Sequence, residues 1–208
     1  MFDLFFLQDS RSNVGSRAMF WRSGGGYTSN INEAEQFTWD NAVKQYQCRE
    51  SDLPYPVRYV RDRAEVGVDS QYLSRSDAEA YCDEDGRVYV AYAREWDGND
   101  LVWFGGKGST SNLEDAIHPD GAETVAYLAQ GLELWPCGYI VERSRPVVRA
   151  SVLDHKGALR SVGLKLPKLA RPRYRSYSNR LNCDGCGRFL TEPQRFETCP
   201  NCGARNAP

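Results

Sequence analysis

Four cysteines in the last 26 residues have the spacing of metal ligands. They form two C-x-x-C pairs, Cys183–Cys186 and Cys199–Cys202, which are separated by 12 residues and each followed by a glycine. Two residues between paired thiolates let the backbone turn around a single ion, and a trailing glycine suits a tight turn. We therefore predict one tetrahedral site with four thiolate ligands: Cys183, Cys186, Cys199 and Cys202.

This spacing resembles that of zinc ribbons, and the resemblance implies one Zn²⁺ per chain. Because thiolates would fill all four positions of a tetrahedron, we expect the metal to be structural, with no position left for a substrate. A ribbon of about 25 residues is expected to need its metal in order to fold. Iron in a rubredoxin-like site is the alternative, and disulfide pairing is a weaker one.

The other cysteines and the two histidines lie outside any such motif. Cys48, Cys82 and Cys137 have no partner at a metal-binding spacing, so we expect buried, small apolar side chains and no nucleophile. His118 and His155 stand in unlike sequence contexts. A Cys–His pair brought together by the fold stays open, since such residues need not be neighbours in the sequence. With no catalytic motif in view, we expect a protein that is not an enzyme.

Charge is divided unevenly along the chain. Residues 1–155 hold 15 Lys and Arg against 25 Asp and Glu, a balance of −10. Residues 156–208 hold 11 basic and 3 acidic residues, a balance of +8. Such a division indicates that the two parts meet different partners, or that they bind each other.

The basic charge is concentrated before the cysteines, where no acid occurs between Asp154 and Asp184. Pro167 and Pro172 exclude a long helix here, so we expect an extended arm. Basic side chains interleaved with tyrosines suit phosphate contacts and base stacking. The alternatives are a solvated linker and a contact with an acidic protein. The candidate contact residues are Lys165, Lys168, Arg171, Arg173, Tyr174, Arg175, Tyr177 and Arg180.

The first 155 residues contain a repeat. GYTSNINEA begins at Gly26 and GSTSNLEDA begins at Gly108, 82 residues later. The glycines suit tight turns, and Asn30 and Asn112 suit helix caps, each with an acid three residues on as in a capping box. A phosphate cradle at 24–26 would lack the lysine and the glycine spacing of a P-loop. The repeated residues therefore predict scaffold, with Trp21 and Trp103 in equivalent buried positions.

Each copy of the repeat predicts the same series of elements. Alternating aromatic runs at 4–9 and 88–93 predict first strands, and 19–21 and 101–103 predict their hairpin partners. Two helices follow in each copy, and the second helix begins after Thr38 or after Asp120. The segments 57–60 and 138–141 match each other at an offset near 80 and predict third strands. Unpaired edge strands of the two units are expected to meet in one continuous sheet.

These elements predict an α+β protein. Two tandem, pseudo-symmetric strand–strand–helix–helix–strand units are expected at 1–75 and 76–155. A basic arm or linker follows at 156–180, and a zinc ribbon at 181–208.

The run FWRSGGGYTSNINEAEQFTWDNAV, residues 20–43, resembles small phage and prophage accessory proteins, most of them uncharacterised. The resemblance lies in a Trp, a Gly-Tyr-Thr turn, an Ala and a Phe-Thr helix start. The second copy departs from it, with Ser109 for Tyr27 and Pro119 for Phe37. The resemblance implies a phage setting in the cytoplasm of a bacterial host, and it supplies no activity.

These features together predict a non-catalytic accessory protein that binds and inhibits or redirects a host nucleoprotein machine. A defence complex such as CRISPR and the transcription apparatus are the candidate targets. One alternative is a zinc-ribbon protein that binds phage DNA or RNA, and another is an enzyme with a site between the repeats. No run approaches the roughly 20 apolar residues of a membrane span, and MFDLFFLQD is expected to be a strand. The sequence predicts no particular oligomeric state.

Overall fold

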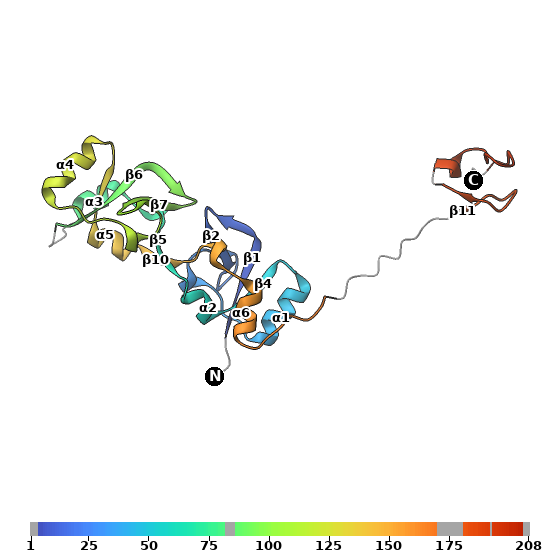
Figure 1. Ribbon diagram of the computed structural model, residues 1–208, viewed down its shortest axis with the longest axis horizontal. Coiled ribbons are helices and arrows are strands. Elements are labelled where there is room, and N and C mark those ends of the chain that lie inside the picture. The colour runs from blue at the N-terminus through green and yellow to red at the C-terminus, as the bar shows by residue number, and fades with distance from the viewer. Residues whose placement is uncertain (1–3, 82–85, 170–180, 192, 206–208) are drawn as a thin grey trace. The chain divides into compact units, whose positions relative to one another are not determined.

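The computed structural model shows a mixed α/β chain that separates into two compact units, Met1–Pro167 and Lys168–Pro208 (Figure 1). The smaller unit carries the cysteine cluster. The part of the chain that the structure describes consists of residues 4–81, 86–169, 181–191 and 193–205.

The larger unit contains two antiparallel four-stranded sheets with the same strand order. The first sheet has the order β3-β2-β1-β4, and the second has the order β8-β7-β6-β9. The hairpins expected from the aromatic alternation are present as β1–β2 and β6–β7. The strands are β1 (Phe5–Val14), β2 (Arg17–Trp21), β3 (Tyr27–Thr28), β4 (Asp52–Pro56), β6 (Val88–Asp97), β7 (Asp100–Gly105), β8 (Gly108–Thr110) and β9 (Glu133–Pro136).

The remaining elements also recur in one order, so that the series from β1 to α3 is repeated from β6 to α6. The first series adds η1 (Ile31–Glu33), α1 (Trp39–Cys48), α2 (Val57–Arg61), β5 (Glu65–Val68), η2 (Ser70–Tyr72) and α3 (Arg75–Ala80). The second adds η3 (Leu113–Asp115), α4 (Gly121–Ala129), α5 (Cys137–Glu142), β10 (Ser144–Val147), η4 (Ala150–Val152) and α6 (His155–Ser161).

The expected third strands are wrong, because 57–60 and 138–141 lie in helices α2 and α5. The strands lie just upstream and end at Pro56 and Pro136, each of which is the residue before its helix. Proline cannot donate to a strand ladder, and its fixed φ is compatible with a helix start. A run of four residues is too short to distinguish a strand from a helix by its period.

The asparagine caps occur, but on single 3₁₀ turns. Asn30 Oδ1 accepts from the backbone N–H of Asn32 at 3.1 Å, and Asn112 makes the corresponding contact with Glu114 at 3.4 Å. The acids three residues on accept from the asparagine side-chain amides instead of completing a backbone capping box. The longer helices α1 and α4 do begin after Thr38 and Asp120, without a side-chain cap.

The expected equivalence of Trp21 and Trp103 is wrong by one residue. In the strand ladders Thr28 pairs with Phe20, and Thr110 pairs with Trp103. Phe20 therefore corresponds to Trp103, and both are fully buried, whereas Trp21 is half-buried. The connection from Phe20 to Thr28 is one residue longer than the corresponding connection from Trp103 to Thr110, which displaces the sequence repeat from the structural register.

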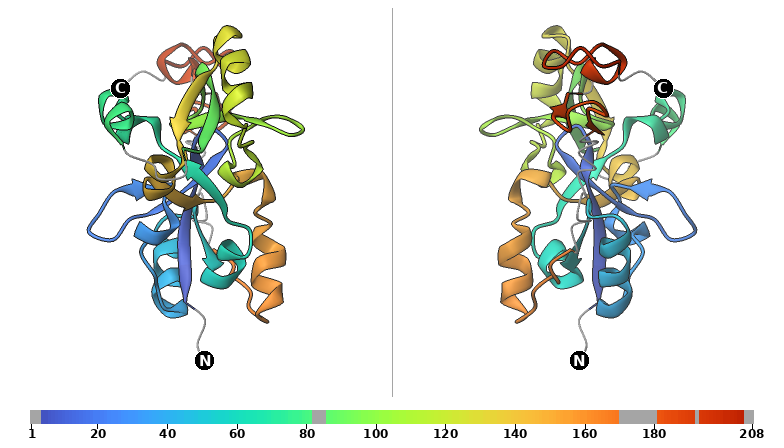
Figure 2. Two further views of the ribbon diagram at one scale, coloured as in Figure 1. Left: turned by 90° about the vertical axis from the view of Figure 1, so that its left-hand side faces the viewer. Right: turned by 90° about the vertical axis from the view of Figure 1, so that its right-hand side faces the viewer.

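Each sheet is completed by a segment that follows the other copy of the repeat. The core around β6 and β7 includes Val68 and Ala78, which belong to β5 and α3. The core around β1 and β2 includes Val148 and Ala158, which lie next to β10 and in α6. Figure 1 shows α6 beside β4 and α2, and α3 beside α5, and both views of Figure 2 show orange α6 along teal α2.

We name the two packed bodies by their cores. The first lobe comprises 4–64 with 148–166, and the second lobe comprises 86–143 with 68–81. The chain crosses between the lobes where β5 pairs antiparallel with β10. The continuous sheet expected from joined edge strands is wrong, because the two four-stranded sheets stay separate and this two-stranded ribbon connects the lobes.

The smaller unit holds a short hairpin of β11 (Leu181–Asn182) and β12 (Phe189–Leu190), followed by the 3₁₀ turn η5 (Pro193–Phe196). Its small core consists of Leu190 with Cys183 and Cys199. So small a core is typical of a fold that depends on a metal.

The tips of the two long hairpins touch at a pair of glycines. Gly15 and Gly98 both have positive φ, at 59° and 67°. A Cβ at Gly98 would lie 2.6 Å from the backbone nitrogen of Gly15, and a Cβ at Gly15 would likewise meet the backbone of Gly98. The lobes can approach this closely only because both positions lack a side chain.

We predict that Gly98→Ala lowers the free energy of unfolding by more than Gly131→Ala does. Gly131 also has positive φ, at 78°, but an added Cβ there meets no atom within 4 Å. Both variants bear the strain of a left-handed alanine, about 1–2 kcal/mol, and only Gly98→Ala forces the hairpins apart. Urea unfolding measures the difference, and equal losses would show that the tip contact contributes nothing.

Candidate functional site

The four predicted ligands lie together in the smaller unit. Their sulfur atoms are all within 4.8 Å of one another. The Sγ atoms of Cys183 and Cys202 are 3.6 Å apart, and those of Cys186 and Cys199 are 3.8 Å apart. Four Zn–S bonds of about 2.3 Å in a tetrahedron place the sulfurs about 3.8 Å from one another. The predicted grouping is therefore confirmed, and its size fits a metal of the zinc class.

Two similar loops position these thiols. In the first, the backbone N–H of Cys183 donates to Arg188 at 2.8 Å and that of Gly187 donates to Cys183 at 2.7 Å. In the second, Cys199 donates to Ala204 and Gly203 donates to Cys199, both at 2.8 Å. Both glycines have positive φ, at 70° and 71°. The glycine after each C-x-x-C pair thus provides the left-handed turn that its sequence position predicts.

Hydrogen bonds around two of the four sulfurs favour their ionised form. The backbone N–H of Arg188 and the side-chain amide of Asn201 lower the pKa of Cys186 to about 6. The backbone N–H groups of Asn201 and Cys202 lower the pKa of Cys199. Metal ligands must be thiolates, so this environment suits a cation at Cys186 and Cys199. At Cys202 the backbone of Ala204 lowers the pKa, but hydrogen bonds with the thiols of Cys186 and Cys183 raise it to about 12.

We predict one equivalent of zinc per chain, and we predict that Cys199→Ser loses most of it because a tetrahedral site lacks one of its four thiolates. Cys48→Ser is the matched control, because Cys48 is exposed and lies in α1 of the other unit. Metal analysis of the purified proteins measures both. Full zinc retention by Cys199→Ser, or equal loss from Cys48→Ser, would contradict the assignment.

The three other cysteines differ from one another. The expected burial of Cys48 is wrong, because it ends α1 with its side chain exposed, whereas Cys137 is buried as expected. Cys82 lies outside the described residues. The Cys–His contact that the sequence left open does form, with His118 Nδ1 3.3 Å from Cys137 Sγ. Burial, with the charge of Arg87, lowers the pKa of His118, which disfavours the imidazolium that would activate a thiolate.

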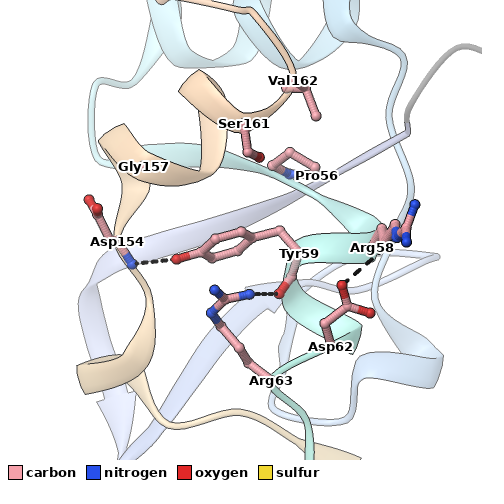
Figure 3. A pocket seen from close by; sticks show the side chains of 9 residues that line it. All are labelled: Pro56, Arg58, Tyr59, Asp62, Arg63, Asp154, Gly157, Ser161 and Val162. Carbon is pink, nitrogen blue, oxygen red and sulfur yellow. Dashed lines mark hydrogen bonds and ion pairs between the residues drawn. The ribbon is translucent and has the colours of Figure 1, made fainter.

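A pocket of about 740 Å³ lies between α2 and α6 in the first lobe (Figure 3). The ring of Tyr59 lines the pocket, with the Arg63 guanidinium 3.6 Å from the ring centroid. Arg58 lines the pocket from α2, Asp62 lines it from the position just after α2, and Ser161 lines it from α6. Sequence analysis missed this site, although corresponding Tyr and Arg pairs at 59 and 63 and at 139 and 143 were a signal.

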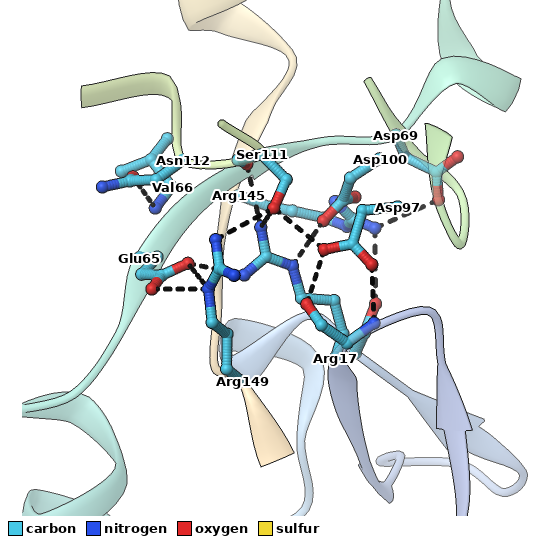
Figure 4. Close-up of polar contacts among 12 residues, drawn as sticks. Arg17, Glu65, Val66, Asp69, Asp97, Asp100, Ser111, Asn112, Arg145 and Arg149 are labelled. Atoms are coloured by element: carbon cyan, nitrogen blue, oxygen red, sulfur yellow. Dashed lines mark hydrogen bonds and ion pairs between the residues drawn. The ribbon is translucent and has the colours of Figure 1, made fainter. Parts of the chain in front are cut away.

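A cluster of ion pairs joins the lobes, with Arg17 at its centre (Figure 4). Arg17 is 1% exposed. Its Nε donates to Asp100 Oδ2 at 2.9 Å, its Nη1 donates to Glu65 Oε2 at 2.6 Å, and its Nη2 donates to the carbonyl of Ser111 at 2.8 Å. Asp100 is also 1% exposed, so this pair is removed from solvent.

The charges of this cluster are inverted between the two copies of the repeat. The strand ladders and isolated bridges make Arg17 correspond to Asp100, Glu65 to Arg145, and Asp69 to Arg149. Each contact therefore has a charge-reversed counterpart. Arg17–Glu65 corresponds to Arg145–Asp100, both at 2.6 Å, and Arg149–Glu65 at 2.9 Å corresponds to Arg145–Asp69 at 3.2 Å.

Asp97 adds a carboxylate at the edge of this cluster. It accepts from the hydroxyl and the backbone N–H of Ser16 at 2.5 and 2.6 Å, and from the Ser111 hydroxyl at 2.9 Å. Burial would raise the pKa of Asp97, but these hydrogen bonds lower it below its ordinary value. The ionised form therefore links the hairpin tip of the first lobe to the second lobe.

We predict that Asp97→Asn destabilises the protein at pH 7 by about 1–2 kcal/mol, because charge-assisted hydrogen bonds are lost. A depressed pKa contributes stability that is present above the unfolded-state value near 4 and is lost as pH falls through the folded-state value. The difference in the free energy of unfolding between Asp97→Asn and the parent should therefore become smaller below about pH 4. Glu95→Gln is the control, an exposed strand residue with the same change of charge. Urea unfolding at several pH values tests this, and a pH-independent difference would contradict it.

The predicted basic arm begins within the first lobe. Residues 155–161 form α6, and Leu164 and Leu166 pack against the core of Phe5 and Leu7. Lys165 and Lys168 are exposed between and after these leucines. The other predicted contact residues lie outside the described part of the chain: Arg171, Arg173, Tyr174, Arg175, Tyr177 and Arg180.

Comparison with family models, with curated proteins and with solved structures finds no match to this chain. Among the described residues, none of the helices has the length and apolar character that crossing a bilayer requires.

Proposed function

We propose that this protein is a non-catalytic binding protein built from a two-lobed body and a zinc ribbon. The observation that carries the proposal is the grouping of four cysteine sulfurs within 4.8 Å. Four thiolates leave a tetrahedral zinc no open position for a substrate, so the metal serves to hold the ribbon in shape.

The interface between the lobes also favours binding over catalysis. An active site between the lobes would need space for a substrate, but Arg17 and Asp100 fill this interface with an ion pair that is almost fully buried. We further propose that residues 4–166 are two copies of one unit that exchange their last strand and helix. This reading rests on the repeated element order and on the inverted charges.

The target we propose is a nucleoprotein machine of a bacterial host, such as a defence complex or the transcription apparatus. Residues 156–180 hold 8 basic and no acidic residues, whereas residues 181–208 hold 3 of each, so phosphate contact is assigned to the segment before the ribbon. The ribbon offers Phe189 and Phe196, which are 64% and 63% exposed. The phage setting rests on the resemblance of residues 20–43 to phage and prophage accessory proteins.

The alternative is a protein that binds phage DNA or RNA directly. The same basic residues and the interleaved Tyr174 and Tyr177 favour it, since lysine and arginine neutralise phosphates and aromatic rings stack on bases. The two proposals differ in whether binding depends on nucleic acid alone.

We predict that binding to a labelled single strand falls steeply with salt, because each neutralised phosphate releases counterions. Six contacts would give a log–log slope of about −4. Reversing Arg171, Arg173 and Arg175 to Glu should flatten the slope and weaken binding for every base sequence. The matched control reverses the exposed body residues Lys44, Arg61 and Lys107. A mobility-shift titration at two salt concentrations measures all three proteins.

A steep slope lost only from the arm variant supports phosphate contact by this segment. Equal weakening by the control triple would show that total charge alone sets the affinity. Binding that is unchanged in the arm variant would contradict this role of the segment. A host-protein pull-down that survives nuclease favours a protein target, and one that nuclease abolishes favours the nucleic-acid alternative.

A further inference from the structure

In the second lobe, the side chain of Tyr81 fills a space whose counterpart in the first lobe is open. Tyr81, which follows α3, packs edge-on against Tyr139 of α5 with ring centroids 5.8 Å apart. Its hydroxyl donates to Glu142 Oε1 at 2.8 Å. Gly138 lies against the ring, since a Cβ there would be 2.9 Å from Tyr81 Cε1. A phenol ring is thus held by a tyrosine, a carboxylate and a glycine.

The same helices meet in the first lobe with the same anchoring contacts. The backbone N–H of Ser74 donates to Tyr139 Oη at 2.8 Å, and that of Asp154 donates to Tyr59 Oη at 3.1 Å. In each lobe an arginine four residues after this tyrosine donates to the tyrosine carbonyl at 3.0 Å and lies over the ring. The buried Ala78 and Ala158 mark equal steps along α3 and α6.

Counting from these anchors, Ser161 corresponds to Tyr81, and a hydroxymethyl group stands where the second lobe has a phenol. The residues that correspond to the contacts of Tyr81 all line the pocket of about 740 Å³: Arg58 for Gly138, Tyr59 for Tyr139 and Asp62 for Glu142. Figure 3 shows Arg63 on one side of the Tyr59 ring, and Pro56 and Ser161 on the other. The pocket is therefore open at the place that a tyrosine occupies in the second lobe.

We propose that this pocket binds a phenol ring from outside the lobe, in the manner of Tyr81. The ring would lie edge-on against Tyr59, and its hydroxyl would donate to the carboxylate of Asp62. The ligand is a tyrosine side chain of a partner or a free small phenol, which share this chemistry. The inference depends on the paired geometry of the lobes and is independent of the metal and of the basic segment.

Arg58 sets one difference from the second lobe. Its Cβ occupies the position that Gly138 leaves empty, so the bound ring lies farther from α2 than Tyr81 lies from α5. The Arg58 side chain is 89% exposed, and its Nε is 3.9 Å from Asp62 Oδ2, so it leaves the carboxylate able to accept another hydrogen bond. Replacing Arg58 by glycine should therefore deepen the site.

The direct test is ligand-observed NMR with p-cresol, whose ring and hydroxyl match a tyrosine side chain. A ligand of eight heavy atoms is expected to bind with a Kd of about 1 mM. 4-Methylanisole keeps the ring but has no hydroxyl donor, and it should bind at least about 5-fold more weakly. In Asp62→Asn this preference should shrink. N-acetyltyrosinamide distinguishes the two possible ligands. Binding equal to that of p-cresol indicates a tyrosine in a polypeptide, and weaker binding indicates a free phenol.

The matched variant is Arg58→Gly with Ser161→Tyr, which rebuilds the second lobe's arrangement in the first. It should remain folded, because its new tyrosine meets Tyr59 and Asp62, and it should lose p-cresol binding. Arg58→Gly alone should bind at least as tightly as the parent.

The converse variant, Tyr81→Ser, opens the second lobe and provides a chemical rescue. It should lower the Tm, and p-cresol should restore part of the loss, since a ligand that binds only the folded state stabilises it. The Tyr81→Ser measurement keeps the test informative if the rebuilt variant fails to fold. The proposal is overturned if p-cresol does not bind the parent, if it binds the folded rebuilt variant equally well, or if 4-methylanisole binds as tightly as p-cresol.

Discussion

The buried ion pair between Arg17 and Asp100 is the interaction on which the rest of the larger unit depends. Two charges that are each 1% exposed are stable only while they face each other, since removing one partner leaves the other uncompensated at a cost of about 3–5 kcal/mol. The charges around this pair alternate in sign, because Glu65 pairs with Arg17 and Arg145 pairs with Asp100. The two lobes are therefore alike in fold and complementary in charge. Two identical lobes would place like charges at the same point.

The proposed exchange of segments involves the same charged residues. β5 and β10 carry Glu65 and Arg145 through the junction, and the helices that follow them complete the opposite cores. Neither lobe has its full core without the other, so the pair is expected to unfold as one body. A scaffold fixed in this way can differ at its periphery without loss of fold. Tyr81 and Ser161 show such a difference, since one closes a site and the other leaves it open. The four clustered cysteines lie in a separate compact unit, whose core is small.

The cysteine cluster and the hairpins could be predicted from the sequence because each depends on local spacing. C-x-x-C-G fixes its own loop, and aromatic alternation fixes a strand. The helices at 57–61 and 137–142 could not, because matching segments of only four residues fit either a strand or a helix. The packing of α3 and α6 depends on contacts between distant residues, such as Ser74 with Tyr139, 65 positions apart, and Asp154 with Tyr59, 95 positions apart. The sequence repeat gives no sign of these contacts. The repeat instead indicated an equivalence of Trp21 and Trp103 that a single extra loop residue displaces. The pairing of Arg17 with Asp100 is equally hidden, because inverted charges remove the similarity by which a repeat is detected.

The central claim, that an inverted set of charges pairs two copies of one unit, is tested most directly by exchanging the charges between the copies. The half exchange makes the first copy's charges like those of the second and turns three of the five ion pairs repulsive: Arg17→Asp, Glu65→Arg and Asp69→Arg. The full exchange restores all five with reversed polarity by adding three further substitutions: Asp100→Arg, Arg145→Glu and Arg149→Asp. The free energy of unfolding in urea is the measurement. The account predicts that the half exchange is unfolded or severely destabilised and that the full exchange recovers a cooperative transition. A full exchange no more stable than the half exchange, or a half exchange as stable as the parent, would contradict it.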